Sequence, residues 1–168
     1  MNIWSLPRYV AGELRENHDD PYWWRNRLFH RVIGPFHIHV YPTRRGAIDV
    51  ATADWDTLVV LDACRADLFG ARAVSAAFDS VETVTSPGSA TQEWTRQTWV
   101  GRTFGDTVYV TANPFVSREA GDAFHDIYEP WLTHFDEETR TVHPDDVTEV
   151  ALEAHAAHPN KRVVVHYM

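Results

Sequence analysis

Cysteine and long apolar runs are both scarce in this sequence of 168 residues. The single cysteine, Cys64, excludes an internal disulfide and any metal cluster built from several cysteines, so a reducing compartment is expected. No apolar run approaches the ~18 residues that a membrane-spanning helix needs. The N-terminus also lacks the apolar core and the small-residue cleavage site of a secretory signal. These absences predict a soluble, cytoplasmic protein.

Basic charge is also in short supply. The chain has 24 acidic side chains against 15 basic ones, a formal charge of −9 at pH 7, and Lys161 is its only lysine. This balance excludes binding to nucleic acid through a general electrostatic field, because counterion release needs a net cationic face. Excess acid with almost no lysine is typical of a halophilic archaeon's salty cytoplasm, where charge repulsion is screened within ~3 Å at molar salt. A GC-rich genome also favours arginine over lysine, so both explanations stay open.

What is present is the composition of a folded chain. Hydrophobic residues make up 44% of the sequence and aromatic residues 12%, and the length suits one domain of ~100–200 residues. The character of the chain changes near residue 50. We therefore expect an aromatic and basic helical extension over 1–50 and an α/β domain over 51–168.

The extension contains one helix with clear start and stop signals. Asp19 and Asp20 can cap a helix that starts at Pro21, and Gly34–Pro35 ends it. Trp24, Leu28 and Val32 form an apolar stripe on this helix. The stripe is expected to pack on the rest of the domain, as most such stripes do. Contact of residues 21–33 with a membrane surface is the alternative interpretation, because arginines lie off that stripe.

After residue 49, short apolar runs alternate with helical patterns. Such alternation predicts βαβ units, and therefore an α/β fold with a doubly wound, mostly parallel sheet and helices on both faces. The expected strands are Thr57–Leu61, Val81–Thr85, Thr107–Thr111 and Arg162–His166, and the expected helices are Cys64–Phe78, Thr91–Val100 and Pro144–His158.

A carboxylate stands directly after the first expected strand. Asp62 follows Thr57–Leu61 and would lie at the carboxyl edge of the sheet, where rigid backbone support suits metal coordination or phosphoryl chemistry. A helix N-cap without a ligand is the alternative role for Asp62. We also expect an ion pair between Arg65 and Asp67, and a small, buried, unreactive Cys64.

A second polar segment, Ser86-Pro87-Gly88-Ser89-Ala90-Thr91, forms a turn that delivers hydroxyl groups to the start of a helix. Backbone N–H groups and the positive end of the helix dipole stabilise anions there. Because this turn and Asp62 would share one edge of the sheet, together they predict a metal site beside a nucleophile. An ordinary hydroxyl at a helix start is the alternative for Thr91.

Other kinds of site have weaker support. His37-Ile38-His39 places two imidazoles on one face of a strand, a spacing found in metal hydrolases, but ten histidines make such a pair an easy coincidence. Asp19-Asp20 with Asp62 does not fit an acidic phospho-acceptor cluster, because no hydrophobic strand precedes the pair. The sequence has no Gly-x-Gly-x-x-Gly or Gly-x-x-x-x-Gly-Lys loop, so nucleotide binding through such a loop is not expected.

Three segments together resemble a known family. They are Leu61-Asp62-Ala63-Cys64-Arg65-Ala66-Asp67-Leu68-Phe69, then Ser86-Pro87-Gly88-Ser89-Ala90-Thr91, then Tyr109-Val110-Thr111-Ala112-Asn113-Pro114. Over residues 50–168 the pattern resembles the sulfatase-like branch of the alkaline phosphatase superfamily, and it looks closest to sulfatase-like proteins of halophilic archaea. The resemblance implies the N-terminal part of an alkaline-phosphatase-like fold, in which an Asp at the end of the first strand binds a divalent metal.

By this resemblance Asp62 matches the metal-binding Asp, and the metal is expected to be zinc, calcium or manganese. Gly88-Ser89-Ala90-Thr91 is similar to the Gly-Thr-x-Thr turn of phosphoethanolamine transferases, which makes Thr91 the candidate nucleophile and Ser89 the second choice. The formylglycine route of true sulfatases is not expected, because Cys64-Arg65-Ala66 does not match Cys-x-Pro-x-Arg. The family's Asp-His pair has no counterpart in the chain, and its substrate His would lie beyond Met168.

The expected function is therefore that of a metal-dependent hydrolase or transferase, acting through Thr91 on phosphate, phosphodiester or sulfate esters. Its substrate would be a small molecule or an ester linked to a glycan or lipid. The alternative is a truncated, non-catalytic sulfatase-like domain with a binding or structural role, because a complete metal site cannot form if Met168 is the true end of the chain.

Overall fold

The computed structural model describes residue 15 and residues 18–28, 46–62, 64–71 and 77–168. Contacts divide the chain into two units, Met1–Pro42 and Thr43–Met168. The domain boundary expected near residue 50 stays a prediction.

The described helix of the first unit is α2, Pro21–Leu28. It begins where the sequence predicts, and the Asp20 carboxylate caps it by accepting a hydrogen bond from the Tyr22 backbone N–H at 2.8 Å. The remainder of the predicted helix and its stop signal lie outside the described residues. Contact of residues 21–33 with a membrane surface stays a prediction. No helix in the described part of the chain is long and apolar enough to cross a bilayer.

The larger unit is built around a four-stranded sheet with the strand order β1-β6-β2-β3. These strands are β1, Thr57–Leu61, β2, Phe104–Thr111, β3, Phe124–Tyr128, and β6, Arg162–Tyr167. Every pairing in this sheet is parallel. The protein is therefore an α/β protein with a parallel sheet, which confirms the predicted class.

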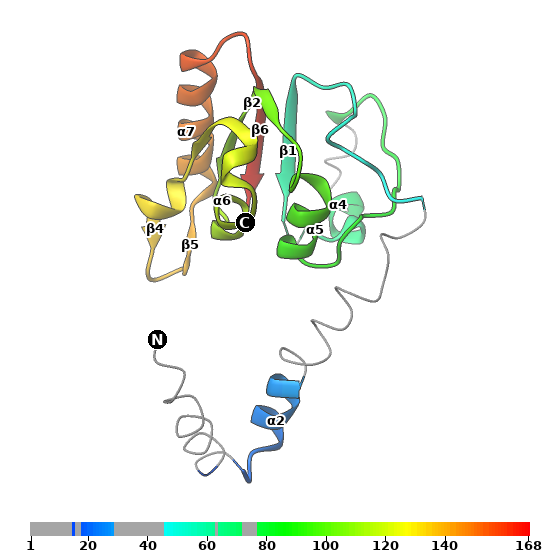
Figure 1. Ribbon diagram of the computed structural model, residues 1–168, viewed down its shortest axis with the longest axis vertical. Coiled ribbons are helices and arrows are strands. Elements are labelled where there is room, and N and C mark those ends of the chain that lie inside the picture. The colour runs from blue at the N-terminus through cyan, green and yellow to red at the C-terminus, as the bar shows by residue number, and fades with distance from the viewer. Residues whose placement is uncertain (1–14, 16–17, 29–45, 63, 72–76) are drawn as a thin grey trace. The chain divides into compact units, whose positions relative to one another are not determined.

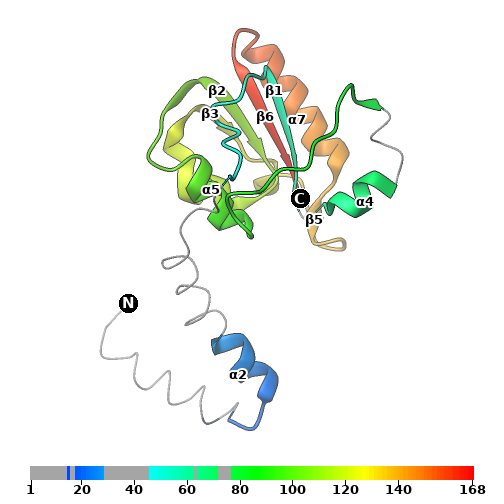
Figure 2. The same ribbon diagram turned by 90° about the vertical axis from the view of Figure 1, so that its right-hand side faces the viewer.

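Helices cover both faces of the sheet (Figure 1, Figure 2). The helix α7, Pro144–Ala157, packs on the face that carries Val108 and Val110. On the opposite face, α5, Thr91–Thr98, and α6, Pro114–Ala120, pack around Tyr109. The side chains of β2 alternate between the two layers because successive residues of a strand point to opposite faces.

The helix α7 confirms the prediction over Pro144–His158 almost residue for residue. Pro144 occupies the first turn, where its missing N–H costs nothing, and two acidic residues of that turn face the positive end of the dipole. The inner face of this helix is apolar, since Val147 and Ala154 are buried in the core and Val150 packs against it. Sequence signals within this segment were therefore sufficient to predict the helix.

The structure corrects three other predictions. Val81–Thr85 is not a strand, because its pairing within the described residues is limited to an isolated bridge between Ala47 and Thr85. The helix expected from Cys64 begins later, as α4, Ala66–Ala71, and residues 72–76 lie outside the described part. Cys64 itself is exposed rather than buried, since it precedes the helix that would have covered it.

Several short elements have no counterpart in the sequence prediction. Besides α6 and β3, they include the 3₁₀ turns η4, Gly121–Ala123, and η5, Pro130–Leu132. A two-stranded antiparallel hairpin pairs β4, Phe135–Asp136, with β5, Thr141–Val142. Elements this short carry too few residues for a hydrophobic period to stand out.

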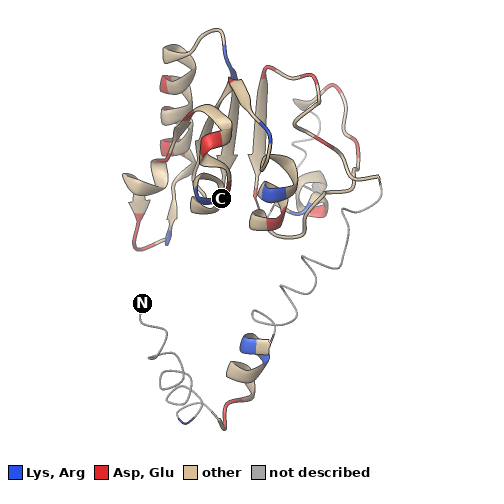
Figure 3. Cartoon of the chain, viewed as in Figure 1, with Lys and Arg blue, Asp and Glu red and all other residues tan. Residues whose placement is uncertain are grey.

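Acidic residues recur along the outward side of α7 and near the β4–β5 hairpin (Figure 3). Those of the helix are Asp145, Asp146, Glu149 and Glu153, all at least partly exposed. The excess of negative charge thus lies on the surface of the larger unit. Adaptation to high salt stays a prediction.

The Asp136 carboxyl group gives one pH-dependent prediction. The Glu138 backbone N–H, then the Thr139 hydroxyl and then His143 stabilise its charged form and lower its pKa from 3.8 to about 2. Because the folded pKa is depressed, the contribution of Asp136 to hairpin stability is present above about pH 3.8 and is lost as the pH falls toward 2. An NMR titration should place the Asp136 midpoint near 2, and a midpoint at 3.8 would contradict these hydrogen bonds.

Candidate active site

Three neighbouring strands end at the same edge of the sheet. In the parallel register, Leu61 of β1 pairs with Tyr167 of β6, and Thr111 of β2 pairs with His166. The backbone N–H of Asp62 donates to the Tyr167 carbonyl at 3.1 Å, so Asp62 continues the line of β1 by one residue. The carboxyl ends of the strands therefore bring residues from distant segments to one place, as expected for a parallel sheet.

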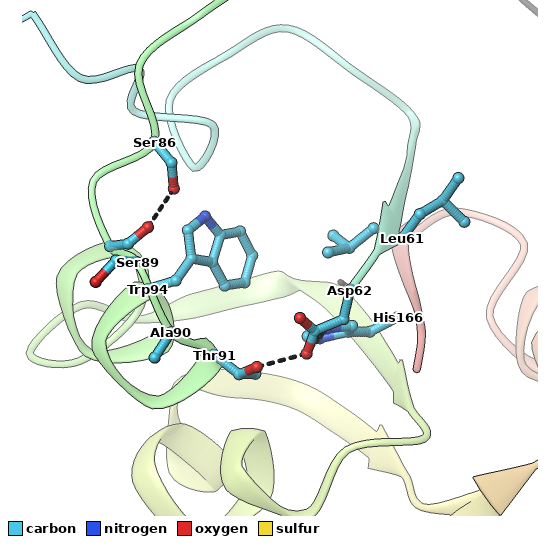
Figure 4. A pocket seen from close by; sticks show the side chains of 10 residues that line it. Leu61, Asp62, Ser86, Ser89, Ala90, Thr91, Trp94 and His166 are labelled. Atoms are coloured by element: carbon cyan, nitrogen blue, oxygen red, sulfur yellow. Dashed lines mark hydrogen bonds and ion pairs between the residues drawn. The ribbon is translucent and has the colours of Figure 1, made fainter. Parts of the chain in front are cut away.

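A pocket of about 450 Å³ opens at this edge (Figure 4). Its apolar wall includes Val60, Leu61 and Trp94. Its polar side chains are Asp62, Ser86, Ser89, Thr91 and His166. Among these lining residues there is no lysine or arginine, so Asp62 gives the pocket wall a negative charge.

The Asp62 carboxylate and the Thr91 hydroxyl point toward each other (Figure 4). Thr91 Oγ1 donates to Asp62 Oδ2 at 2.5 Å, across 29 positions of sequence. The same oxygen accepts a hydrogen bond from Asn113 Nδ2 at 3.1 Å and lies 3.5 Å from His166 Nε2. The two features that the sequence assigns to one sheet edge therefore meet there. Asp62 is not the N-cap of α4, because that helix begins at Ala66.

Thr91 is the first residue of α5, and its neighbours hold it in place. Ser89 donates from both its backbone N–H and its hydroxyl to Glu93 Oε2, each at 2.9 Å, which ties the turn to the first turn of the helix. Gly88 lies so close to α5 that a Cβ there would be 2.4 Å from the Trp94 backbone nitrogen. The turn thus depends on a glycine at this position to bring Thr91 to the pocket.

Between the two candidates for the nucleophile, the hydrogen bonds favour Thr91. The Ser89 hydroxyl is engaged with Glu93 of the helix that follows it, whereas the Thr91 hydroxyl contacts Asp62. Both side chains line the pocket.

Two polar residues of this site were not predicted as site residues from the sequence. Asn113 follows β2, caps α6 by accepting from the Phe115 N–H at 3.0 Å, and donates to Asp62 with its amide. His166 follows three consecutive valines within the strand β6. A polar residue at the end of a buried strand was the available signal for both, but only the strand order shows that they adjoin Asp62.

The donor set bears on whether a divalent cation would fit. Asp62 and Thr91 offer oxygen atoms in contact with each other, which is the donor type that hard divalent cations prefer. Within the described residues, no group of three or more His, Cys, Asp or Glu side chains is arranged to hold a metal ion. These residues therefore fit part of a coordination shell, with Asp62 as its carboxylate.

The remaining candidates lie elsewhere or outside the described part. Arg65 and Asp67 form the predicted ion pair, with Arg65 Nη2 2.9 Å from Asp67 Oδ2, and both side chains are exposed. The His37–His39 pair lies outside the described residues.

The fold and the pocket together define an α/β protein with a polar site at the carboxyl edge of a parallel sheet. Comparison of the chain with protein-family models, with curated proteins and with solved structures found no match.

Proposed function

We propose that the pocket is the nucleophilic part of an enzyme site that hydrolyses or transfers phosphate, phosphodiester or sulfate esters. The observation that carries this proposal is the hydrogen bond from Thr91 Oγ1 to Asp62 Oδ2 at the N-terminus of α5. A hydroxyl is a weak nucleophile until a neighbouring group accepts its proton or stabilises its charged form. The Asp62 carboxylate is such a neighbour, and both side chains line the same pocket.

In the proposed reaction, the Thr91 oxygen attacks the phosphorus or sulfur atom of the ester. A bond from Thr91 Oγ1 to that atom forms as the bond to the ester oxygen breaks, and the alcohol leaves with the proton that Thr91 gives up through Asp62 Oδ2. Asp62 Oδ2 is placed to accept the Thr91 proton. Water or an acceptor hydroxyl then attacks the Thr91 ester and restores the free hydroxyl.

The charge of the pocket supports a requirement for a divalent cation. An anionic ester would meet the negative Asp62 carboxylate, and the lining residues supply no lysine or arginine to offset it. The N-terminus of α5 contributes part of the positive potential through its first backbone N–H groups. A zinc, calcium or manganese ion held by Asp62 would supply the rest and make the Thr91 hydroxyl more acidic. Its further ligands would come from outside the described residues.

Membership of the sulfatase-like branch of the alkaline phosphatase superfamily is part of the same proposal. It is supported by the three motif segments and by the position of Asp62 directly after β1 of a parallel sheet. A non-catalytic domain with the same fold is the second candidate, and the incomplete set of metal-binding side chains among the described residues favours it.

The test is hydrolysis of nitrophenyl phosphate, bis-nitrophenyl phosphate and nitrophenyl sulfate by the full chain, with zinc, calcium and manganese added separately. We expect turnover with at least one combination of ester and cation. In Thr91→Ala the turnover rate should fall on the order of 10³-fold or more, because the nucleophile is removed. Thr91→Ser, which keeps a hydroxyl, should retain part of the activity. Ser89→Ala, the control from the same turn, should retain most of the activity, because the backbone N–H of residue 89 can still donate to Glu93.

Each alternative outcome has a distinct meaning. Full turnover in Thr91→Ala would exclude Thr91 as the nucleophile, and loss of turnover in Ser89→Ala would assign that role to Ser89. If the wild-type chain hydrolyses none of the esters with any cation, and calorimetry detects no cation binding that Asp62→Asn removes, the non-catalytic candidate is favoured.

A further inference from the structure

His166 is a buried polar residue that follows three consecutive valines in β6. Its side chain is 1% exposed, and it lies between Val60 of β1 and Thr111 of β2 in the parallel register. The Trp94 ring meets the imidazole edge-on, with ring centroids 5.9 Å apart. Burying an imidazole costs free energy unless its nitrogen atoms have hydrogen-bond partners, so the contacts of both nitrogens are informative.

The first nitrogen, Nδ1, lies 3.0 Å from the Tyr109 hydroxyl oxygen. Tyr109 is fully buried, and burial raises the pKa of its phenol well above the ordinary value of 10.0, so the phenol keeps its proton. A protonated phenol can donate to Nδ1. In a neutral imidazole, that hydrogen bond leaves the ring proton on Nε2.

The second nitrogen, Nε2, faces the candidate active site. It lies 3.5 Å from Asp62 Oδ2, within ion-pair distance, and has no hydrogen-bond partner in the described part of the chain. With its proton on Nε2, His166 presents a positive N–H to this carboxylate, whereas the other tautomer would present a lone pair to a negative oxygen. The carboxylate and the phenol therefore favour the same tautomer.

We propose that His166, held in the Nε2–H tautomer by Tyr109, is a positioning residue that keeps the Asp62 carboxylate directed at Thr91. Its role in turnover rests on the proposed function, in which Thr91 is the nucleophile. Asn113 and His166 approach Asp62 Oδ2 from the ends of two different strands, and Thr91 donates to the same oxygen from α5. The chain Tyr109–His166–Asp62–Thr91 thus connects the buried core to the pocket.

The tautomer can be measured without metal or substrate. In the full chain with a chelator present, ¹⁵N-edited NMR spectra of the histidine rings should show His166 protonated at Nε2 and unprotonated at Nδ1. Tyr109→Phe removes the hydroxyl but keeps the ring, and it should convert His166 to a mixture of tautomers. Tyr128→Phe is the matched control, because the Tyr128 hydroxyl lies 3.3 Å from Nε2 of a different histidine, His158.

Two results for the wild type and the Tyr109→Phe variant would overturn the arrangement. One is a wild-type His166 that carries a proton on Nδ1. The other is a Tyr109→Phe variant whose His166 signals are the same as those of the wild type. A change in His166 caused equally by Tyr128→Phe would also contradict it, since that hydroxyl is not beside His166.

Kinetics with the ester and cation that support wild-type turnover then test the positioning role. Tyr109→Phe and His166→Gln should lower kcat by ~10–100-fold, the usual effect of losing a residue that orients a metal-bound carboxylate, with a smaller change in KM. Unchanged kcat in a folded Tyr109→Phe variant would overturn this role. The expected tautomer in a chain without any turnover would support the arrangement and overturn the proposed function, so the two failures are distinguishable.

Discussion

Replacing Trp99 with alanine is expected to destabilise the larger unit by ~3–5 kcal/mol, the usual cost of deleting a large aromatic core residue. Trp99 is 0% exposed and is the C-cap residue that follows α5. Its ring makes edge contacts with four aromatic rings whose centroids are 5.1 to 5.9 Å away: Phe104, Phe124, Tyr109 and Trp94. Alanine would leave a cavity at the centre of this aromatic cluster.

Urea unfolding followed by circular dichroism measures this loss. Because domains are stable by only ~5–15 kcal/mol, Trp99→Ala could leave part of the sample unfolded, and Trp99→Phe provides a smaller change with a smaller expected loss. Trp24→Ala is the control, since this tryptophan is 46% exposed and surface substitutions usually change stability by less than ~0.5 kcal/mol. A Trp99→Ala loss no larger than that of the control would contradict the buried position of the ring.

Replacing Gly88 with alanine is the second large effect that we expect. The new Cβ would lie 2.4 Å from the backbone nitrogen of Trp94 and 2.7 Å from its Cα, so backbone atoms have to move. Overpacking of this kind usually costs ~1–3 kcal/mol. The movement would also displace the start of α5, which carries Thr91, so we expect loss of ester turnover together with a lower Tm.

Gly105→Ala is the matched control for this change. A Cβ at Gly105 would meet no atom within 4 Å, and the residue lies in β2, where alanine is no worse than glycine. Its Tm and turnover should therefore stay at the wild-type values or rise slightly. If Gly88→Ala behaves like Gly105→Ala in thermal unfolding and in turnover, close packing of the Gly88 turn against α5 is not what positions Thr91.

Much of the framework could be predicted because its signals are local. β1 is a short run of threonine, leucine and valine, and β6 contains three consecutive valines, so their length and composition favour strand over helix. α7 has both a start signal at Pro144 and a helical apolar period. The strand expected over Val81–Thr85 was wrong for the converse reason. Its valines and threonines favour a strand, but in the described part of the chain the segment pairs only through the bridge at Thr85.

The strand β3 illustrates what a sequence period misses. Phe124–Tyr128 includes a histidine and an aspartate, and its exposed positions reflect a place at the end of the sheet order. Parallel pairing with β2 stabilises it, through partners such as Val108 with Asp126 and Tyr109 with Ile127. Such pairing involves segments separated by a helix, so propensity within the strand itself carries little of the information.

The candidate site likewise has a part that could be predicted from the sequence and a part that could not. The sequence by itself determined that Asp62 follows a strand and that Thr91 starts a helix, because both depend on neighbours within a few residues. Only the tertiary structure decided that β6 lies between β1 and β2, which brings His166 beside Asp62 and places Asn113, 51 positions away, on the same carboxylate oxygen. The physical reason is that strand order and register are set by the packing of two helical layers against the sheet, which no local period encodes.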